Sequence, residues 1–423
     1  MNQDTHIPLV LTRDDDESIS FIPDELRRVV LRILKKGSSS RGLVSTKRLH
    51  RAAEGGDPYF VASAVYDFLW KQVASDSRKL LYPVVGDFFL TALEQTLGQI
   101  GPNNMSSRFA ELMECYKLSG DVQRSLEGPL YCADLFLLKV TQLVLSAGES
   151  ANAQTDHAAQ PQTLRGSEFL VERKYTVEEQ IQHSLELARD ALLDCQKALA
   201  RISDGKNAPN DSYITFVRKS MNRLSLSWEQ WNEMHQQKGI LNKSPEEYIN
   251  EGLVRAEKVN SLVLAALLLE QAGEEYQDKT CRMFLNHHFS DKPADHPSRG
   301  CIFDAGEIYR DQGIAERTNG AYLLSERRFT RAIQLFAQLH DRTSLAQTLI
   351  ERARVFMYKQ AESWRAHDDL HLAAQNIAAY QKRLPPTGPL PELAPEQVLH
   401  FLEHKNLAEE AKAYKAHDKT LHD

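Results

Sequence analysis

The residues in this sequence best suited to hold a metal ion are histidines that stand close together. Two pairs are spaced four positions apart, so the members of each pair would share one face of a helix. These pairs are His367 with His371 and His400 with His404. A third group combines imidazole and carboxylate side chains in a polar segment, and consists of His287, His288, Asp291 and His296. Such donors suit zinc or nickel, so each group is a candidate metal site.

Each histidine motif lacks a part that a metal enzyme needs. The first pair carries Asp368 where the zinc-protease helix H-E-x-x-H has its general-base glutamate. The second pair fits H-x-x-E-H with Glu403, but only 19 residues follow it, too few to supply the third ligand in the way that motif requires. We therefore expect surface histidines, no bound metal and no cofactor.

Other catalytic motifs are absent from the sequence. It has no phosphate-binding glycine loop, no G-x-S-x-G elbow and no kinase motif set. The five cysteines are Cys115, Cys132, Cys195, Cys281 and Cys301; none forms a C-x-x-C pair, which favours a reducing compartment. We predict that the chain is not an enzyme. The alternative is a helical enzyme with an unrecognised active site that uses a metal ion at the histidine clusters.

Charge and hydropathy argue against several classes of protein. The net charge of −7 disfavours nucleic-acid binding, which needs a basic surface. Residues 1–20 lack the basic start and apolar run of a signal peptide, and the longest apolar run, 262–269, is too short for a transmembrane segment. We expect a cytoplasmic protein, or one delivered into another cell by a route that needs no signal peptide.

One strongly basic segment is a candidate for contact with an anionic membrane. Residues 24–51 carry nine Lys or Arg against two acidic residues, a local net charge of +7. The favoured interpretation is an amphipathic core helix with a charged outer face, because its apolar stripe is wide enough to be buried.

Apolar residues recur at helical spacing along most of the chain, and no segment shows sustained strand alternation. The fold class is therefore all-α. Helices are predicted at about 57–72, 81–98, 106–118, 129–147, 169–203, 212–223, 227–238, 245–258, 260–285, 301–311, 314–326, 328–340, 343–361, 364–383 and 396–416. The predicted divisions are a disordered acidic tail (1–20), an N-terminal helical domain (21–147), a linker (148–167), a repeat domain (168–384), a Pro-rich break (385–395), and a C-terminal helix and tail (396–423).

One segment carries a pattern beyond periodicity. Between 313 and 344, small and large residues alternate as Gly320, Leu323, Phe329, Ala332 and Phe336. This pattern resembles the tetratricopeptide repeat, a 34-residue pair of antiparallel helices. Ala353 and Phe356 take the same roles one repeat later. The resemblance covers roughly 245–383 and implies helical hairpins stacked as an α-solenoid, with an N-terminal bundle or degenerate repeat region; an ordinary helical bundle is the other reading.

The resemblance also implies a binding groove lined by the first helix of each pair. The positions that match are Ile314, Arg317, Ala321, Leu324, Gln347, Ile350, Arg354 and Tyr358. The repeat proteins that clamp a terminal carboxylate use Lys and Asn there, so that role is not expected. We predict a protein-protein interaction module that acts as scaffold, chaperone, or regulator or inhibitor of another protein, with Arg317, Arg354 and Tyr358 as its strongest anchors.

Overall fold

The computed structural model describes residues 63, 75–97, 101–153, 175–203, 209–237, 239–273, 276–293, 295–296, 300–359 and 363–422. Within these ranges every regular element is a helix and no strand occurs, so the all-α class is confirmed. The helices are α4 (Ser75–Thr96), α5 (Pro102–Ser119), α6 (Val122–Ala153), α7 (Val177–Ser203), α8 (Asp211–Gln236), a 3-10 turn η1 (Ile240–Asn242), α9 (Pro245–Lys258), α10 (Leu262–Ala272), α11 (Lys279–His288), α12 (Cys301–Thr318), α13 (Tyr322–Gln338), α14 (Arg342–Tyr358), α15 (Ser363–Gln381), α16 (Pro395–His404) and α17 (Ala408–His422).

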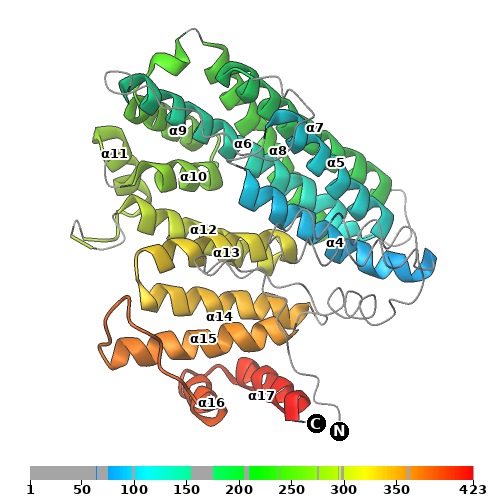
Figure 1. Cartoon of the computed structure of the whole chain (residues 1–423), viewed down its shortest axis with the longest axis vertical. Coiled ribbons are helices and arrows are strands. Elements are labelled where there is room, and N and C mark those ends of the chain that lie inside the picture. The colour runs from blue at the N-terminus through cyan, green and yellow to red at the C-terminus, as the bar shows by residue number, and fades with distance from the viewer. Residues whose placement is uncertain are drawn as a thin grey trace, which may run out of the picture.

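Most helices pack against the helix that precedes or follows them in the chain. In Figure 1, α9, α10, α12, α13, α14 and α15 succeed one another down the picture, and α4 to α8 form a bundle beside the upper part of this series. α16 and α17 lie beyond α15 at the lower end. α13 contacts α6 as well as α12 and α14, so it joins the bundle to the series.

Helix boundaries agree with the sequence prediction best where capping residues mark them. α9 runs from Pro245 to Lys258, as predicted, because Ser244 and Glu247 form a capping box at its start. Other predicted boundaries are wrong. The predicted helices 212–223 and 227–238 are one helix, α8, whereas 260–285 and 396–416 are each divided in two. Gly273 and Asn406, both with positive φ, stand at these two divisions.

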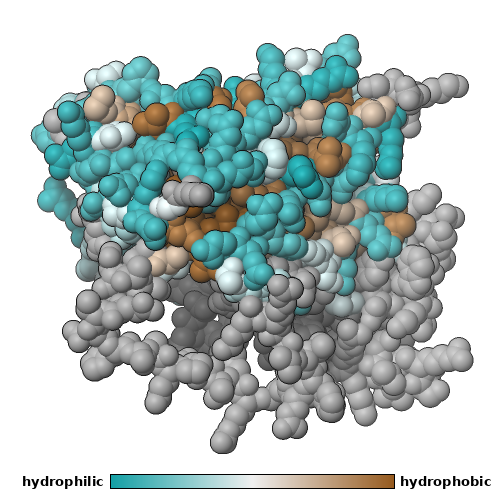
Figure 2. Space-filling model, turned by 90° about the horizontal axis from the view of Figure 1, so that it is seen from above, coloured by the Kyte–Doolittle hydropathy of each residue, from teal (hydrophilic) through white to brown (hydrophobic). Residues whose placement is uncertain are grey.

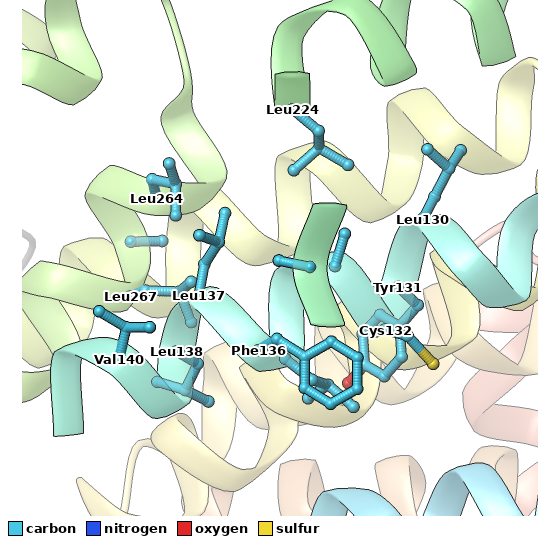
Figure 3. Packing of buried hydrophobic residues seen from close by; sticks show 14 of the residues in the cluster. Leu130, Tyr131, Cys132, Phe136, Leu137, Leu138, Val140, Leu224, Leu264 and Leu267 are labelled. Atoms are coloured by element: carbon cyan, nitrogen blue, oxygen red, sulfur yellow. The ribbon is translucent and has the colours of Figure 1, made fainter. Parts of the chain in front are cut away.

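A single hydrophobic core extends from α4 to α13, and α6 runs through it. All residues of α6 between 126 and 141 are buried, and Figure 3 shows its Leu137 gathered with Leu224 of α8 and Leu264 of α10. Among the described residues, only the segment of α6 at Val122–Ala147 has the length and composition to cross a membrane. Its most apolar window is 78% buried by other helices, as in the core helix of a globular fold.

The helices on either side of the predicted linker share this core. α6 continues to Ala153, inside the predicted linker 148–167, and α7 packs along α6. The predicted N-terminal and repeat domains therefore meet in one packed interior. The predicted acidic tail 1–20 and basic segment 24–51 lie outside the described residues.

The predicted Pro-rich break is non-helical from 385 to 394 and is tied to α14. The buried guanidinium of Arg342 donates hydrogen bonds to the main-chain oxygens of Leu384 at 3.4 Å and Pro386 at 3.1 Å. These bonds compensate for the few donors that a proline-rich backbone offers.

The outer surface follows from the amphipathic pattern of the helices. Figure 2 views the end that is uppermost in Figure 1, and the coloured part of its surface is mainly hydrophilic, with hydrophobic patches between the hydrophilic residues. Polar outer faces and apolar inner faces are what helices packed around one core require.

Two glycines in α12 allow α13 to pack closely against it. A β-carbon at Gly306 would lie 2.8 Å from the ring of Phe336, and one at Gly313 would lie 2.8 Å from the ring of Phe329. The prediction that Gly320 holds this place in mid-helix is wrong. Gly320 lies in the turn between α12 and α13 at φ +82°, so the predicted helix 314–326 is two helix ends joined by that turn.

We expect Gly313→Leu to lower the free energy of unfolding by about 2–3 kcal/mol, because the added side chain must push α12 away from Phe329. Gly320→Ala is the matched control: nothing but the ring of Tyr213, at 3.9 Å, lies near its β-carbon position, so it should cost about 1 kcal/mol through backbone strain alone. Urea unfolding followed by circular dichroism measures both. Equal losses would contradict close packing at Gly313.

Candidate functional site

Three consecutive charged residues in the first half of α13 are buried: Glu326, Arg327 and Arg328. Successive residues on a helix point about 100° apart, so the three side chains reach different neighbours. Glu326 contacts α14 and α15, Arg327 contacts α4, and Arg328 contacts α6 and α12. Because α13 is enclosed, these charges must find their partners inside the fold.

Arg328 sits between two buried carboxylates. Its Nε donates to Glu316 of α12 at 3.3 Å, and its Nη2 pairs with Asp134 of α6. Burial raises the pKa of Glu316 to about 7 and also raises that of Asp134, against the opposing effect of the guanidinium. One positive and two negative charges leave a net negative charge, so a proton on Glu316 near neutral pH balances this Arg328 triad.

The other two charges of the run are paired equally closely. Arg327 donates from Nη1 to Glu94 at 3.2 Å. Glu326 accepts from Arg365 at 2.9 Å and pairs with Lys359. Burial alone would raise the pKa of Glu326, but these cations hold it well below its usual value. α13 is thus linked by charge to the bundle on one side and to α14 and α15 on the other.

Glu127 of α6 caps the N-terminus of α13 from a distant part of the sequence. Its Oε2 accepts the main-chain N–H groups of Leu323 at 2.8 Å and Leu324 at 3.1 Å, and its Oε1 accepts the hydroxyl of Tyr213 at 2.9 Å. The local N-cap residue, Ala321, has no side chain that could do this. Burial outweighs the three hydrogen bonds and raises the pKa of Glu127 to about 7.

A cavity of about 190 Å³ lies between α4, α6, α10, α12 and α13. Its polar wall includes Arg327, Arg328, Arg331, Glu94 and Asp134, and its apolar wall includes Leu97, Leu135, Leu138 and Leu267. Four buried polar atoms of its lining have no hydrogen-bond partner among the described residues: Asp134 Oδ1, Gln142 Oε1, the Tyr309 hydroxyl and Arg327 Nε. Buried polar atoms are normally paired, so this cavity suits water or a small polar ligand.

The predicted groove residues on α14 share one side of that helix. Gln347, Arg354 and Tyr358 recur at helical spacing, and Ile350 lies half-buried at its edge. Arg317 of α12 joins them through Glu351, which accepts its Nη2 at 2.9 Å. We call the surface formed by Arg317, Gln347, Glu351, Arg354 and Tyr358 the α12–α14 face.

Two predicted groove residues are not accessible. Ala321 is fully buried, and Leu324 is 2% exposed because it belongs to α13 rather than to a first helix. Both positions were predicted wrongly because Gly320 was assigned to the middle of a helix, whereas it lies in the turn between α12 and α13. Of the predicted repeat positions, Leu323, Phe329, Ala332 and Phe336 are buried in α13, and Ala353 and Phe356 are buried in α14.

The two histidine pairs that share a helix face lie in different surroundings. His367 stacks on Tyr414 of α17 with ring centroids 4.2 Å apart, and Nδ1 of His371 lies 3.0 Å from the Tyr414 hydroxyl. The rings of His400 and His404 stack 6.3 Å apart on exposed parts of α16.

His287 and His288 gather with Glu257 of α9, their donor atoms all within 4.8 Å of one another. Asp291 and His296 do not belong to this group. Elsewhere in the described ranges, no other set of three such residues has this spacing.

Nothing in the local sequence pattern indicates that these charges are buried. A run such as Ser325-Glu326-Arg327-Arg328 is typical of a solvated turn, and its partners lie up to 240 positions away. Comparison of this chain with protein-family models, with curated proteins and with solved structures finds no match.

Proposed function

We propose that this protein binds another protein on the α12–α14 face, and that the pairs α12–α13 and α14–α15 act as tetratricopeptide-like repeats that present it. The observation that supports this most is that the Tyr358 ring is both exposed and ordered. Its side chain is 62% exposed, yet its ring is already ordered by stacking on Tyr322, with centroids 5.3 Å apart and planes at 17°. A large aromatic ring held in place at the surface loses little entropy on binding.

Charged side chains around Tyr358 form an ordered polar rim. Glu351 links Arg317 to Arg354, and Arg354 pairs with Glu410 of α17 at 2.5 Å. A partner segment with an apolar residue over Tyr358 and a carboxylate near Arg317 would match both features.

Site-specific photo-crosslinking tests this proposal. A photoreactive phenylalanine at position 358 should crosslink one partner from the native cell extract, because that position would lie in the contact. The control places it at Tyr380 of α15, which is also 62% exposed. Identical crosslinked products at positions 358 and 380, or none at 358, would contradict binding at this face.

A second candidate function is the binding of a small zwitterion in the 190 Å³ cavity. Asp134 and Gln142 offer acceptors for an ammonium group, Arg327 offers a donor for a carboxylate, and the leucine wall suits an aliphatic body. A cavity of about 150 Å³ accommodates benzene, so this one suits a molecule of roughly six to nine non-hydrogen atoms. A small aliphatic amino acid fits that description.

Titration calorimetry with L-valine, isobutylamine and isovalerate tests the second candidate. L-Valine should bind more tightly than either half, and Gln142→Leu should weaken its binding at least tenfold. Gln347→Leu, on the exposed α12–α14 face, should leave L-valine binding unchanged. The absence of heat from all three compounds would indicate a cavity that holds water only.

A further inference from the structure

Two of the five cysteines lie next to each other although 20 positions separate them in the sequence. Cys281 in the first turn of α11 and Cys301 at the start of α12 are both fully buried, and their sulfur atoms are 3.2 Å apart. Both are free thiols. A disulfide bond is about 2.05 Å long, so the two sulfur atoms need to approach by only about 1.2 Å to bond.

We propose that Cys281 and Cys301 form a reversible disulfide that fastens α11 to α12 under oxidising conditions. Their juxtaposition carries this proposal: the two thiols come from different helices, and each is the other's hydrogen-bond partner. Cys115, Cys132 and Cys195 have no cysteine neighbour at this distance among the described residues, so a single pairing is expected.

The two thiols are chemically unequal. The hydrogen bond from Cys301 lowers the pKa of Cys281, and the same bond together with burial raises the pKa of Cys301. Cys281 also lies in the first turn of α11, where Asp278 caps the helix and the main-chain N–H of Cys281 is the third in the helix. The thiolate that attacks an oxidant is therefore expected at Cys281.

The oxidant named here is a small disulfide such as oxidised glutathione. The Cys281 thiolate attacks one of its sulfur atoms, and one glutathione leaves as a thiolate. Cys301 then gives up its proton, attacks the Cys281 sulfur of the mixed disulfide, and releases the second glutathione. The net reaction converts two protein thiols and one glutathione disulfide into one protein disulfide and two reduced glutathiones.

The small size of α11 explains how a buried pair could react. α11 has ten residues, of which Cys281, Phe284 and Leu285 are buried, and it packs mainly on α9. A short helix with few buried side chains opens at low free energy, which would give the oxidant transient access to Cys281. Once formed, the disulfide would oppose that opening and restrict the chain between 281 and 301.

Oxidation of the full chain by excess oxidised glutathione tests the proposal. Thiol titration after denaturation should fall from five to three free thiols per chain, and peptide mapping should find one bond between Cys281 and Cys301. The midpoint of thermal unfolding should rise by several degrees on oxidation and return on reduction. Cys281→Ser should keep its four thiols, whereas Cys195→Ser, the control at another buried cysteine, should still lose two.

Two outcomes would overturn the proposal. One is retention of all five thiols after prolonged treatment, including in dilute urea that promotes local opening of α11. The other is a disulfide between any other pair of cysteines. A second variant, Cys281→Ala, serves as a check on Cys281→Ser. If both variants keep their four thiols, the effect comes from the lost thiol rather than from a change in packing.

Discussion

Replacing Arg328 with methionine should lower the free energy of unfolding by about 3–5 kcal/mol at neutral pH, because Asp134 and Glu316 would stay buried without their cation. Methionine fills a similar volume, so lost packing contributes little. A folded domain has about 5–15 kcal/mol in total, which makes this loss large enough to read directly in urea unfolding.

A triple variant separates the charge effect from any effect of shape. When Arg328→Met is combined with Asp134→Leu and Glu316→Met, no uncompensated charge remains in the triad, and most of the lost stability should return. Buried ion groups replaced together by apolar residues are often neutral or stabilising. If the triple variant were no more stable than the single one, the loss in Arg328→Met would not come from leaving Asp134 and Glu316 without their cation.

Stability should depend on pH through Glu127. Burial raises its pKa from 4.5 to about 7 in the folded protein, so the folded state binds a proton that the unfolded state has already released between these values. Stability from this group is therefore complete below about pH 4.5 and falls as pH rises through about 7, by roughly 3 kcal/mol.

Glu127→Gln removes this titration and can still accept the N–H groups of Leu323 and Leu324. Between about pH 5 and 8, the difference in unfolding free energy should move by roughly 2–3 kcal/mol in favour of the variant. Urea unfolding at a series of pH values gives this difference. Parallel curves for the two proteins would mean that Glu127 does not hold a proton in the folded state.

The local rules of helix formation predicted much of the fold. The all-α class follows from apolar periodicity, and α9, α14 and α15 lie close to their predicted ranges, because Ser244 and Asp341 cap the starts of α9 and α14 and Pro385 follows the end of α15. The breaks inside α8 and α13 were predicted wrongly. In α13, the predicted break between 326 and 328 falls among the buried charges Glu326, Arg327 and Arg328, because a pattern that equates burial with apolar residues cannot recognise buried ion pairs.

The candidate site was predictable only in part, for a similar reason. Arg354 and Tyr358 lie on one side of α14 because helical spacing within a single segment puts them there. Contacts between distant segments could not be predicted from local patterns. Arg328 and Asp134 are 194 positions apart, and no local sequence pattern pairs Cys281 with Cys301. The shift of Gly320 from helix to turn also removed Ala321 and Leu324 from the predicted groove.

The most direct test of protein binding at the α12–α14 face is a titration of the crosslinked partner, once purified, against two tyrosine variants. Tyr358→Ala and Tyr380→Ala remove side chains of equal exposure from different helices, so their effects on folding should be alike. We predict that Tyr358→Ala weakens binding by at least 1–2 kcal/mol, about five- to thirtyfold, while Tyr380→Ala binds like the wild type. Wild-type affinity in the Tyr358→Ala variant would contradict the proposed face.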